Sequence, residues 1–457
     1  MSLPVRTESA ESVLDVVGVG FGPSNLALAI AIHEHNRQCA QPKRVRAAFF
    51  EKQDCFGWHT GMLIDDSTMQ VSFMKDLVTV RNPVSDLSFV NYLHSQNRLI
   101  DFINHKTLFP LRVEFHDYLE WAARRMAHFV QYSSKVVDVR PLTDDNRVTG
   151  FDVTVARGLS NGRRALYRTR NVVLAAGIEP HVPAGVELND RVWHNSQLLS
   201  RVEQLNSRSP SAQRLMVVGA GQSAAETVEY LHRCFAEAQV CAVFGRYGYS
   251  PSDDSPFANR IFDPEAVDTY FHAPPNIKQA LFGYHRNTNY SVVDPELIEE
   301  LYRRFYREKV QGHPRLQIMN ASRVIETTST PQAVWATVHN MATGQKVQLE
   351  CDAVVYATGY KPVDPIKLLG RAGELCLVDP QGLVQTKRDY RIATSPEIEG
   401  GVYLQGATDH THGIASTLLS NAAVRAGEIL ESILSRSPED DSQAHPVGAV
   451  ASNATSD

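Results

Sequence analysis

The chain has 457 residues, of which 43% are hydrophobic and 21% are charged, and its formal net charge is -6. This length predicts two or three domains with large cores, and the composition is that of an ordinary globular protein. The charge gives no electrostatic case for binding nucleic acid, and no apolar stretch approaches the roughly 18 residues of a membrane span. The N-terminus lacks a signal-peptide core and the cysteines form no CxxC pair. We therefore expect a cytoplasmic protein with reduced thiols.

The first motif is VVGVGFGPSNLALAI at residues 16–30, where Gly18, Gly20 and Gly22 follow an apolar run. Pro23 stands where a further glycine is usual and opens an apolar pattern of helical spacing, which suits proline at the first position of a helix. Glycines at a strand-to-helix turn allow a tight bend and let the backbone approach a pyrophosphate, which the start of the helix attracts. The motif therefore predicts a dinucleotide site.

An acidic residue follows the second expected strand. The run VRAAFFEK at residues 45–52 reads as a strand that ends near Glu51. A carboxylate at this place can accept hydrogen bonds from the ribose of an adenine nucleotide. A charged residue at the end of a strand is common by itself, so it is the pairing with the glycine turn that favours a nucleotide role for Glu51.

Residues 55–121 do not alternate between strand and helix, and their first part is rich in aromatic, methionine and amide side chains. An irregular segment this apolar is expected to cover a site rather than to lie in solvent, so residues 55–80 are expected to act as a lid. A helix is expected at Val113–Ala122. Strand-like runs then follow at Lys135–Val139, Gly150–Val155 and Asn171–Ala175.

A second glycine turn lies about 200 residues further along the chain. The stretch LMVVGAGQSAAETVEYL at residues 215–231 repeats the order of strand, Gly219, Gly221 and helix. Two such units in one chain indicate two dinucleotides with electron transfer between them. The next strand leads to Arg246 instead of an acidic residue, which suits the 2′-phosphate of NADPH. A merely solvated arginine is the alternative.

The last part of the chain is expected to contain an insertion and a return to the first domain. Turn residues are frequent in 250–275, and the end of residues 286–310 has a helical pattern. Strands are expected near Ala333–His339 and at the start of residues 351–362, and a helix is expected from Thr417.

Several segments, taken together and in order, carry a resemblance to a known family. They are GVGFGPSNLAL (18–28), FGWHTGMLI (56–64), MQVSFMKDLVT (69–79), FPLRVEFHDYLEWAA (109–123), VVGAGQSAAE (217–226), PSDDSPFANRIFDP (251–264), NTNYSV (287–292), DAVVYATGY (352–360) and HGIASTLLS (412–420). The chain resembles the N-hydroxylating flavoprotein monooxygenases of siderophore pathways, most closely the L-ornithine N-delta-hydroxylases. The match runs from residue 16 to about residue 430.

The resemblance implies an α/β fold with two Rossmann-like dinucleotide-binding domains, for FAD and NADPH, and a small, mainly helical substrate-binding insertion. In this family NADPH reduces the flavin, O2 adds to give a 4a-hydroperoxyflavin, and the terminal amine of the amino acid attacks the distal oxygen. L-ornithine would thus become N-hydroxyornithine for a hydroxamate siderophore. L-lysine or a diamine is the alternative substrate, although the run LLS at 418–420 resembles the ornithine enzymes more. The family often forms tetramers, so a homo-oligomer is expected.

The resemblance also implies roles for single residues, with His59 and Gln70 beside the flavin ring. Together with the two glycine turns, the expected cofactor-binding residues are Gly18, Gly20, Gly22, Pro23, Glu51, His59, Gln70, Arg112, Gly219, Gly221, Ser223 and Arg246. The expected substrate-binding residues are Lys75, Asn259, Asn289 and Ser420. Of these sets, Gln70, Lys75 and Asn289 are expected to take part in catalysis, and no metal ligand is expected.

The chemistry explains these residue types. The reaction needs a neutral amine, because only its lone pair is nucleophilic, whereas a terminal ammonium has a pKa near 10.4. A desolvated pocket with amides such as Asn259 and Asn289 favours the free base, because an amide bonds to the amine without strongly stabilising the cation. Lys75 would anchor the carboxylate at the other end; an ordinary surface lysine is the alternative. The flavin carries the oxygen, so the protein must mainly exclude water.

Other polar groups receive structural interpretations. Asp253 and Asp254 could form a general-base pair, but in the run DDSP they are expected to cap or turn the chain. His410 and His412 have no carboxylate or cysteine at metal-binding spacing, so His412 is expected to make a backbone or flavin-edge hydrogen bond. A disulfide reductase would need a CxxC or CxxxxC pair, which the sequence lacks. A Baeyer–Villiger or simple amine monooxygenase, or a redox sensor without turnover, stays as an alternative.

The chain departs from the family pattern in two places. Tyr356 stands where leucine or phenylalanine is usual, and the spacing from the second glycine turn to Asp253 is one residue short, which puts the role of Arg246 in doubt. The expected division is a flexible leader (1–12), the FAD domain (13–195), the NADPH domain (196–250), the substrate insertion (251–304), the second part of the NADPH domain (305–349), the return to the FAD domain (350–435) and a disordered tail (436–457).

Overall fold

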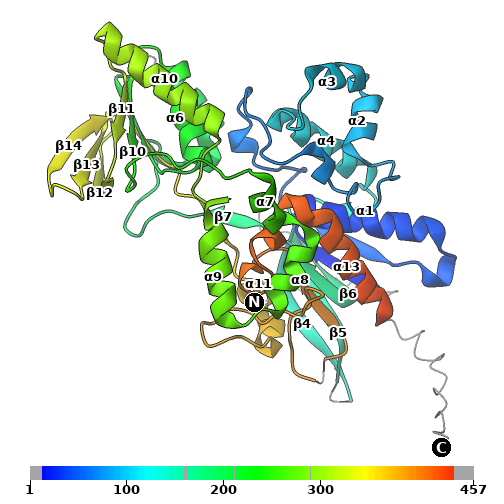
Figure 1. Cartoon of the computed structure of the whole chain (residues 1–457). Helices are drawn as coiled ribbons and strands as arrows, with labels where there is room; N and C mark the ends of the chain where they lie inside the picture. Colours follow the sequence, from blue (N-terminus) through cyan, green and yellow to red (C-terminus); the bar gives the residue numbers. More distant parts are fainter. Residues whose placement is uncertain are drawn as a thin grey trace, which may run out of the picture.

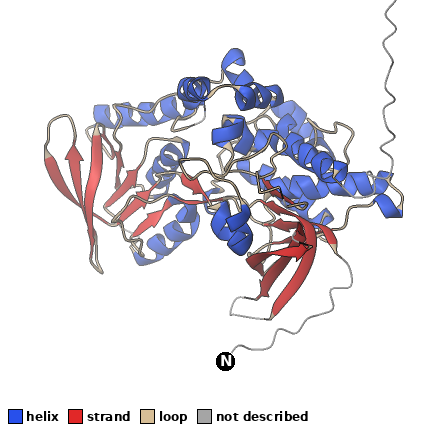
Figure 2. Ribbon diagram, turned by 90° about the horizontal axis from the view of Figure 1, so that it is seen from below, coloured by secondary structure: helices blue, strands red, loops and turns tan. Residues whose placement is uncertain are grey.

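The computed structural model describes residues 13–145, 147–158, 163–209, 212–288, 290–396 and 398–436. The expected leader, nearly all of the expected tail and Asn289 lie outside these residues. Figure 1 shows two halves, each built on its own sheet, and the strands of the two halves form separate groups in Figure 2. Within the described ranges, every helix is too short or too polar to span a lipid bilayer.

The first sheet has seven strands in the order β3-β2-β1-β6-β5-β4, with β17 also paired to β6. Its parallel strands are β1 (Leu14–Val19), β2 (Ala47–Phe50), β3 (Val130–Gln131), β6 (Arg164–Leu174) and β17 (Gly401–Leu404). The antiparallel strands β4 (Ser134–Asp144) and β5 (Arg147–Arg157) continue the sheet beside the beginning of β6. Residues beyond 400 therefore complete a sheet that the N-terminus begins.

Helices cover one face of these parallel strands. There α1 (Pro23–Gln38) and α13 (Ala422–Ser435) pack on each other and share a core with α2 (Phe89–Ser95) and α4 (Arg112–Arg125), while α3 (Leu99–His105) follows α2. The run from Leu26 to Ile32 is buried on all sides, because α1 lies between the sheet and these helices. The opposite face packs against β4, β5 and α11 (Pro365–Leu369).

The second sheet has five parallel strands in the order β11-β10-β9-β15-β8. They are β8 (Val192–His194), β9 (Arg214–Val218), β10 (Gln239–Val243), β11 (Leu316–Met319) and β15 (Ala353–Tyr356). One core lies under α5 (Leu198–Arg208), α6 (Gln222–Cys234) and α10 (Pro295–Gln311). The other lies under a three-stranded antiparallel sheet of β12 (Ser322–Ser329), β13 (Val334–Asn340) and β14 (Lys346–Cys351).

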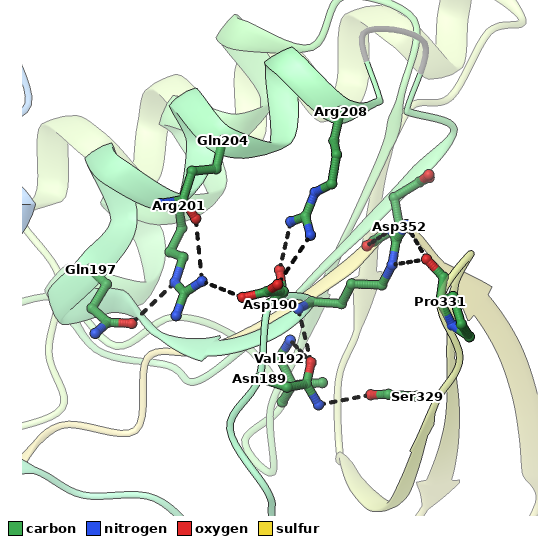
Figure 3. Close-up of polar contacts among 11 residues, drawn as sticks. Asn189, Asp190, Val192, Gln197, Arg201, Gln204, Arg208, Ser329, Pro331 and Asp352 are labelled. Atoms are coloured by element: carbon green, nitrogen blue, oxygen red, sulfur yellow. Dashed lines mark hydrogen bonds and ion pairs between the residues drawn. The ribbon is translucent and has the colours of Figure 1, made fainter.

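Polar contacts around the start of β8 hold these layers together, as Figure 3 shows. Asp190 forms ion pairs with Arg201 (2.9 Å) and Arg208 (3.5 Å) of α5. Asn189 donates a hydrogen bond to the hydroxyl of Ser329 on β12 (3.0 Å). Apart from Arg201, which is partly buried, these groups are exposed, so each contact adds little stability and mainly fixes how α5 and the outer sheet sit on β8.

A helical insertion of the second half docks on the first half. It comprises α7 (Pro256–Asn259), α8 (Pro264–His272) and α9 (Pro275–His285), and α8 packs against α12 (Asp409–His412). Arg388 forms a two-point ion pair with Glu428 of α13 (2.9 Å for both bonds) and binds Asp268 of α8 (2.5 Å). A short antiparallel pair, β7 (Ile178–Pro180) with β16 (Tyr360–Pro362), lies where the chain passes between the halves.

The expected α/β fold with two Rossmann-like halves is confirmed, but the strand pairing differs from the expected division at three boundaries. β8 falls in the range expected for the FAD domain (13–195), and β15 in its expected return (350–435), yet both pair in the second sheet. α10 begins inside the expected insertion (251–304) but packs on α6. Short apolar strands look alike in sequence, and only their long-range partners decide to which sheet they belong.

Candidate functional site

The first glycine turn joins β1 to α1. Gly20 has a φ of +85°, and a Cβ atom there would lie 2.5 Å from the carbonyl oxygen of Ala175, so only glycine fits. At Gly18 a Cβ atom would lie 2.1 Å from the ring of Phe49. Gly22 caps α1, and nothing lies within 4 Å of the position of its missing Cβ. This open space beside the unpaired N–H groups of the helix start fits the pyrophosphate of the expected FAD.

Glu51 follows β2 and lies directly beside this turn. Its carboxylate accepts hydrogen bonds from the backbone N–H groups of Phe21 (2.8 Å) and Gln53 (2.9 Å). Pro23 occupies the start of α1, as expected from its fixed φ. The carboxylate therefore shapes the turn as well as standing where a ribose would bind.

Two amides that the sequence analysis does not single out also hold the turn. Asn25, completely buried in α1, donates to the carbonyl oxygen of Gly20 (2.7 Å), and its own oxygen accepts from Gln405 (2.8 Å). Gln405 follows β17, so only the pairing of β17 with β6 brings it here. Nothing in the local sequence pattern connects positions so far apart.

The second glycine turn joins β9 to α6 and repeats this geometry. Gly219 has a φ of +147°, and a Cβ atom there would lie 2.2 Å from the carbonyl oxygen of Ala357. Gly221 caps α6, and its Cβ position lies 3.3 Å from the Cα atom of Ser291. Ser223 lies half-buried in the first turn of α6. The unpaired N–H groups at the start of α6 are expected to attract a second dinucleotide phosphate, as the sequence analysis predicts.

Arg246 lies shortly after β10 and beside the second turn. Its guanidinium donates to the carbonyl oxygen of Ser291 (2.7 Å) and to the hydroxyl of Ser250 (3.1 Å). In the described part of the chain it has no carboxylate partner. Since Ser291 also faces Gly221, this positive charge stands close to the turn, where a 2′-phosphate would need it.

Arg112, at the start of α4, reaches from the first half into the second. Its guanidinium forms a two-point ion pair with Glu226 of α6, at 2.6 and 3.0 Å, and donates to the carbonyl oxygen of Met62 (3.1 Å). Gln222 also donates to Glu226 (2.9 Å). The resemblance implies that Arg112 contacts NADPH; in this structure its charge is matched by Glu226, and the pair ties the halves together. Glu226 is a residue that sequence reasoning missed.

The expected lid, residues 55–80, is anchored in both halves. Met69 and Leu77 belong to the core of the first half, whereas Met62 and Ile64 belong to the core under α5 and α6. At Gly61 a Cβ atom would lie 1.9 Å from the carbonyl oxygen of Ser196, so the backbone is pressed against the second half. The segment is therefore packed cover between the halves, not a free flap.

His59 and Gln70 both keep exposed surface within this cover. The ring of His59 lies 5.8 Å from that of Tyr360. The surrounding protein lowers the pKa of His59, the Arg112 guanidinium lowers it further, and Glu226 partly opposes this. A neutral imidazole offers one donor and one acceptor, which suits a role at the edge of a flavin ring.

Lys75 and Ser420 come together from opposite ends of the chain. Lys75 ends the 3-10 helix η3 (Phe73–Lys75), which packs against η9 (Leu419–Asn421). Ser420 is 7% exposed, and its hydroxyl has no hydrogen-bond partner among the described residues. Lys75 is half-buried, and no carboxylate in that part of the chain pairs with it. A buried free hydroxyl and an unpaired ammonium are groups that a bound amino acid would satisfy.

The insertion contributes Asn259, whose side chain donates to the carbonyl oxygen of Asp254 (2.6 Å). Asn289 lies outside the described residues. Its neighbour Tyr290 donates to Asp409 of α12 (3.0 Å), and burial raises the pKa of that carboxyl group. The other carboxylate oxygen of Asp409 is buried without a partner among the described residues. This contact fixes the end of the insertion to the first half.

Two structural interpretations are confirmed. The imidazole of His412 bonds to the carbonyl oxygen of Arg388 (3.1 Å) and stacks on Tyr390, and burial lowers the pKa of His412 to about 4. Asp253 accepts a hydrogen bond from the backbone N–H of Ser255 (3.1 Å) and so turns the chain. No group of three or more potential metal ligands occurs within the described ranges.

Comparison with known proteins identifies the family. Residues 12–362 match the family described as L-lysine 6-monooxygenase/L-ornithine 5-monooxygenase. This chain is 40% identical over 442 residues to an L-ornithine N(5)-oxygenase of Arthrobotrys oligospora, covering 94% of this chain and 90% of that protein. An L-ornithine N(5)-monooxygenase of Pseudomonas aeruginosa is 37% identical, covering 92% of this chain and 94% of its own length.

A solved structure of the Kutzneria sp. 744 ornithine N-hydroxylase, with reduced FAD, NADP+ and L-ornithine, has a similar fold. It superimposes with a TM-score of 0.88 at 46% identity, covering 93% of this chain and all of that one. The match extends over both glycine turns, the cover between the halves and the helical insertion. The chain therefore belongs to the L-lysine 6-monooxygenase/L-ornithine 5-monooxygenase family.

Proposed function

We propose that this protein is an NADPH-dependent flavin monooxygenase that uses FAD and O2 to hydroxylate the side-chain amine of L-ornithine. Its product, N-hydroxyornithine, would supply the hydroxamate groups of a siderophore. The observation that carries the proposal is the pair of glycine turns with opposite charges beside them, Glu51 at the first and Arg246 at the second. Bound FAD supplies the redox and oxygen chemistry, and the protein supplies binding, orientation and exclusion of water.

The residues around the first turn would hold FAD. Gly18, Gly20 and Gly22 let the backbone approach its pyrophosphate, and the start of α1 provides N–H donors. Glu51 would accept hydrogen bonds from its ribose. His59 and Gln70, on the exposed side of the packed cover, would border its ring.

The residues around the second turn would hold NADPH. Gly219 and Gly221 form the turn, and Ser223 stands in the first helical turn, where a hydroxyl can bond to a phosphate. Arg246 would bind the 2′-phosphate by exchanging its present carbonyl and hydroxyl acceptors for an anion. Arg112 would lie beside the dinucleotide while holding Glu226.

The substrate would lie between η3, η9 and the insertion. Lys75 and Asn259 would hold its α-carboxylate and backbone end, and Ser420 would make a further contact. Lys75 and Ser420 both lack partners among the described residues. Asn259 and Asn289 would surround the amino acid with neutral amides, which do not hold the terminal nitrogen in its protonated form. Gln70 would orient the reacting groups. The site thus discriminates by charge: a cation for the carboxylate and neutral groups for the amine.

The decisive experiment is to measure hydroxylamine product from L-ornithine, L-lysine, cadaverine and putrescine with FAD and NADPH. We expect product from ornithine, coupled to NADPH oxidation. More product from lysine or a diamine than from ornithine would show that the alternative is correct, namely hydroxylation of lysine or a diamine by the same mechanism. NADPH oxidation that no amine accelerates would favour a redox sensor and contradict the proposal.

A substitution at Lys75 tests how the substrate is anchored. In Lys75→Ala, the KM for ornithine should rise about 10- to 100-fold, because a charge-assisted contact contributes about 1.5–3 kcal/mol. The NADPH oxidase rate without substrate should stay within about two-fold, since Lys75 would not contact the cofactors. Lys135→Ala, at an exposed lysine of β4, is the control. An unchanged KM would remove Lys75 from the site.

We propose a cytoplasmic homotetramer as the working form. Exposed thiols such as Cys55 and Cys234, both free, stay reduced in the compartment that also regenerates NADPH. Exposed apolar residues on α3, Ile100 and Ile103, offer surface for contact between copies. Light scattering of the purified protein would test the assembly, and a monomer at micromolar concentration would contradict it.

A further inference from the structure

Arg425 of α13 is a charged side chain buried completely inside the first half. It is 1% exposed, and its guanidinium contacts only neutral groups. It donates to the hydroxyl of Ser24 (3.0 Å), to the side-chain oxygen of Gln405 (3.5 Å) and to the carbonyl oxygen of Ser416. Within the described residues, no carboxylate lies at ion-pair distance.

The two carboxylates whose charges reach Arg425 already have other partners. Glu428 is held by the two-point ion pair with Arg388, and Asp409 accepts a hydrogen bond from the hydroxyl of Tyr290. Burial lowers the pKa of Arg425, but an arginine stays protonated at neutral pH. A buried guanidinium without an anion is unfavourable, which makes it the natural partner of an anionic ligand.

The contacts of Arg425 lead to the first glycine turn. Ser24 lies in the first turn of α1, immediately after Pro23. Gln405 bonds to Asn25, which in turn bonds to the carbonyl oxygen of Gly20. Figure 1 shows α13 lying beside α1, in agreement with their packing. The positive charge is thus brought to the helix start where the Cβ direction of Gly22 is open.

Burial alone does not distinguish Arg425. Arg391, in the same half, is 4% exposed and donates to the carbonyl oxygens of Ile398 (3.2 Å) and Gly400 (2.8 Å). Those carbonyls precede β17, at the end of that strand away from Gln405. Arg391 therefore braces the backbone without reaching the turn, and it serves as a matched control for Arg425.

We propose that Arg425 provides the positive charge that balances the pyrophosphate of FAD on the first glycine turn. This inference rests on the proposed function, because it needs FAD at that turn. The start of a helix offers only about half a positive charge, whereas the pyrophosphate is negative on each phosphate. The guanidinium of Arg425, on the last helix of the described chain, supplies the rest of the positive charge. Ser24 positions it, and Gln405 joins it to the backbone of the turn.

The experiment measures FAD binding to the full-length protein in Arg425→Met, Arg425→Lys and Arg391→Met. Flavin fluorescence gives the Kd for FAD and for riboflavin, which has no phosphate. We expect Arg425→Met to raise the Kd for FAD at least tenfold and Arg425→Lys to raise it less, with the Kd for riboflavin unchanged in both. Without FAD, the Tm of Arg425→Met should equal or exceed that of the wild type, because an unbalanced buried charge is removed.

The control and the contrary outcomes separate this role from a structural one. Arg391→Met should leave the Kd for FAD unchanged, because Arg391 does not reach the turn. A folded Arg425→Met protein with a wild-type Kd for FAD would overturn the assignment. So would an Arg425→Lys protein that loses as much FAD affinity as Arg425→Met, or an equal loss of riboflavin binding. A wild-type protein that binds no FAD would instead refute the proposed function itself.

Discussion

The two glycine turns are built alike, and they differ in what surrounds them. In each, a glycine with positive φ packs on the carbonyl oxygen of an alanine that follows a neighbouring parallel strand, Ala175 or Ala357. The first turn has open space at Gly22 and a carboxylate, Glu51, bonded to its backbone. At the second turn, the Cβ position of Gly221 faces Ser291, and Arg246 donates a hydrogen bond to the carbonyl oxygen of the same residue.

This contrast indicates that the glycine turn by itself does not determine which dinucleotide binds. The glycines only allow a backbone to approach a phosphate, and the side chains that arrive from elsewhere decide which nucleotide fits. At the first turn these side chains come from β2 and from the C-terminal return; at the second they come from β10 and the insertion. Substitutions in the two turns should therefore have separate consequences.

The largest expected effect follows from filling the glycine positions that press on a carbonyl group. Gly20→Val should abolish FAD binding, and Gly219→Val should abolish reduction of the flavin by NADPH while FAD stays bound. Each combines positive-φ strain with overpacking, at a cost of about 2–5 kcal/mol. Flavin absorbance of the purified variants and stopped-flow reduction by NADPH measure the two outcomes.

Gly158→Val is the control, because Gly158 has a φ of +87° but open space around its Cβ position. It adds strain without a clash, so it should lower the Tm and leave both cofactors bound. If Gly219→Val also lost FAD, the two turns could not be treated as independent sites.

A smaller effect is expected from the charge at the second turn. Arg246→Ala should reduce the preference for NADPH over NADH about 10- to 100-fold, because one charge-assisted contact to a phosphate contributes about 1.5–3 kcal/mol. The ratio of kcat/KM values for the two nucleotides measures it. Arg323→Ala, at an exposed arginine of β12, should leave the ratio as it is. A ratio unaltered by Arg246→Ala would make that residue a brace for the insertion only.

The smallest expected effect concerns the acid stability of the C-terminal return to the first half, where His412 is buried. The pKa of His412 is about 4 in the folded protein, against an ordinary 6.5, because burial disfavours its charged form. Between these values the unfolded chain binds more protons, so stability rises with pH and is lost as the pH falls from 6.5 toward 4. From pH 7 to 5.5 the loss should be about 1 kcal/mol.

Urea unfolding of the wild type and of His412→Gln at both pH values isolates this contribution. The glutamine cannot take up a proton, so the variant should lose about 1 kcal/mol less than the wild type over this interval. An equal loss in both proteins would assign the acid sensitivity to other groups.

The sequence predicts the features that depend on neighbouring residues. Both glycine turns, the strands before them and the helices after them lie where their patterns place them. The helix expected from Thr417 begins at Ala422, after two 3-10 turns, the second of which contains Ser420. Helical spacing cannot reveal these turns, because they bury polar side chains against the first half.

What the sequence does not reveal depends on contacts across long stretches of chain. The Arg112–Glu226 ion pair joins residues of different halves, and the link from Arg425 to Ser24 joins the two ends of the fold. Arginine reads as a surface residue in any local pattern, and only the packing of α13 on α1 shows that Arg425 is buried. The family resemblance predicts roles for single residues, but only the folded structure shows which residues contact them.

The pairing of β17 with β6 bears on the order in which the protein matures. The last strand of the second sheet has been synthesised by residue 356, whereas β6 still lacks β17 and α1 lacks α13 until the final segments are made. Since domains generally fold as units during synthesis, the half that starts first is finished last. FAD binding therefore follows the synthesis of the C-terminal segments, and we expect a chain truncated before residue 400 not to bind FAD.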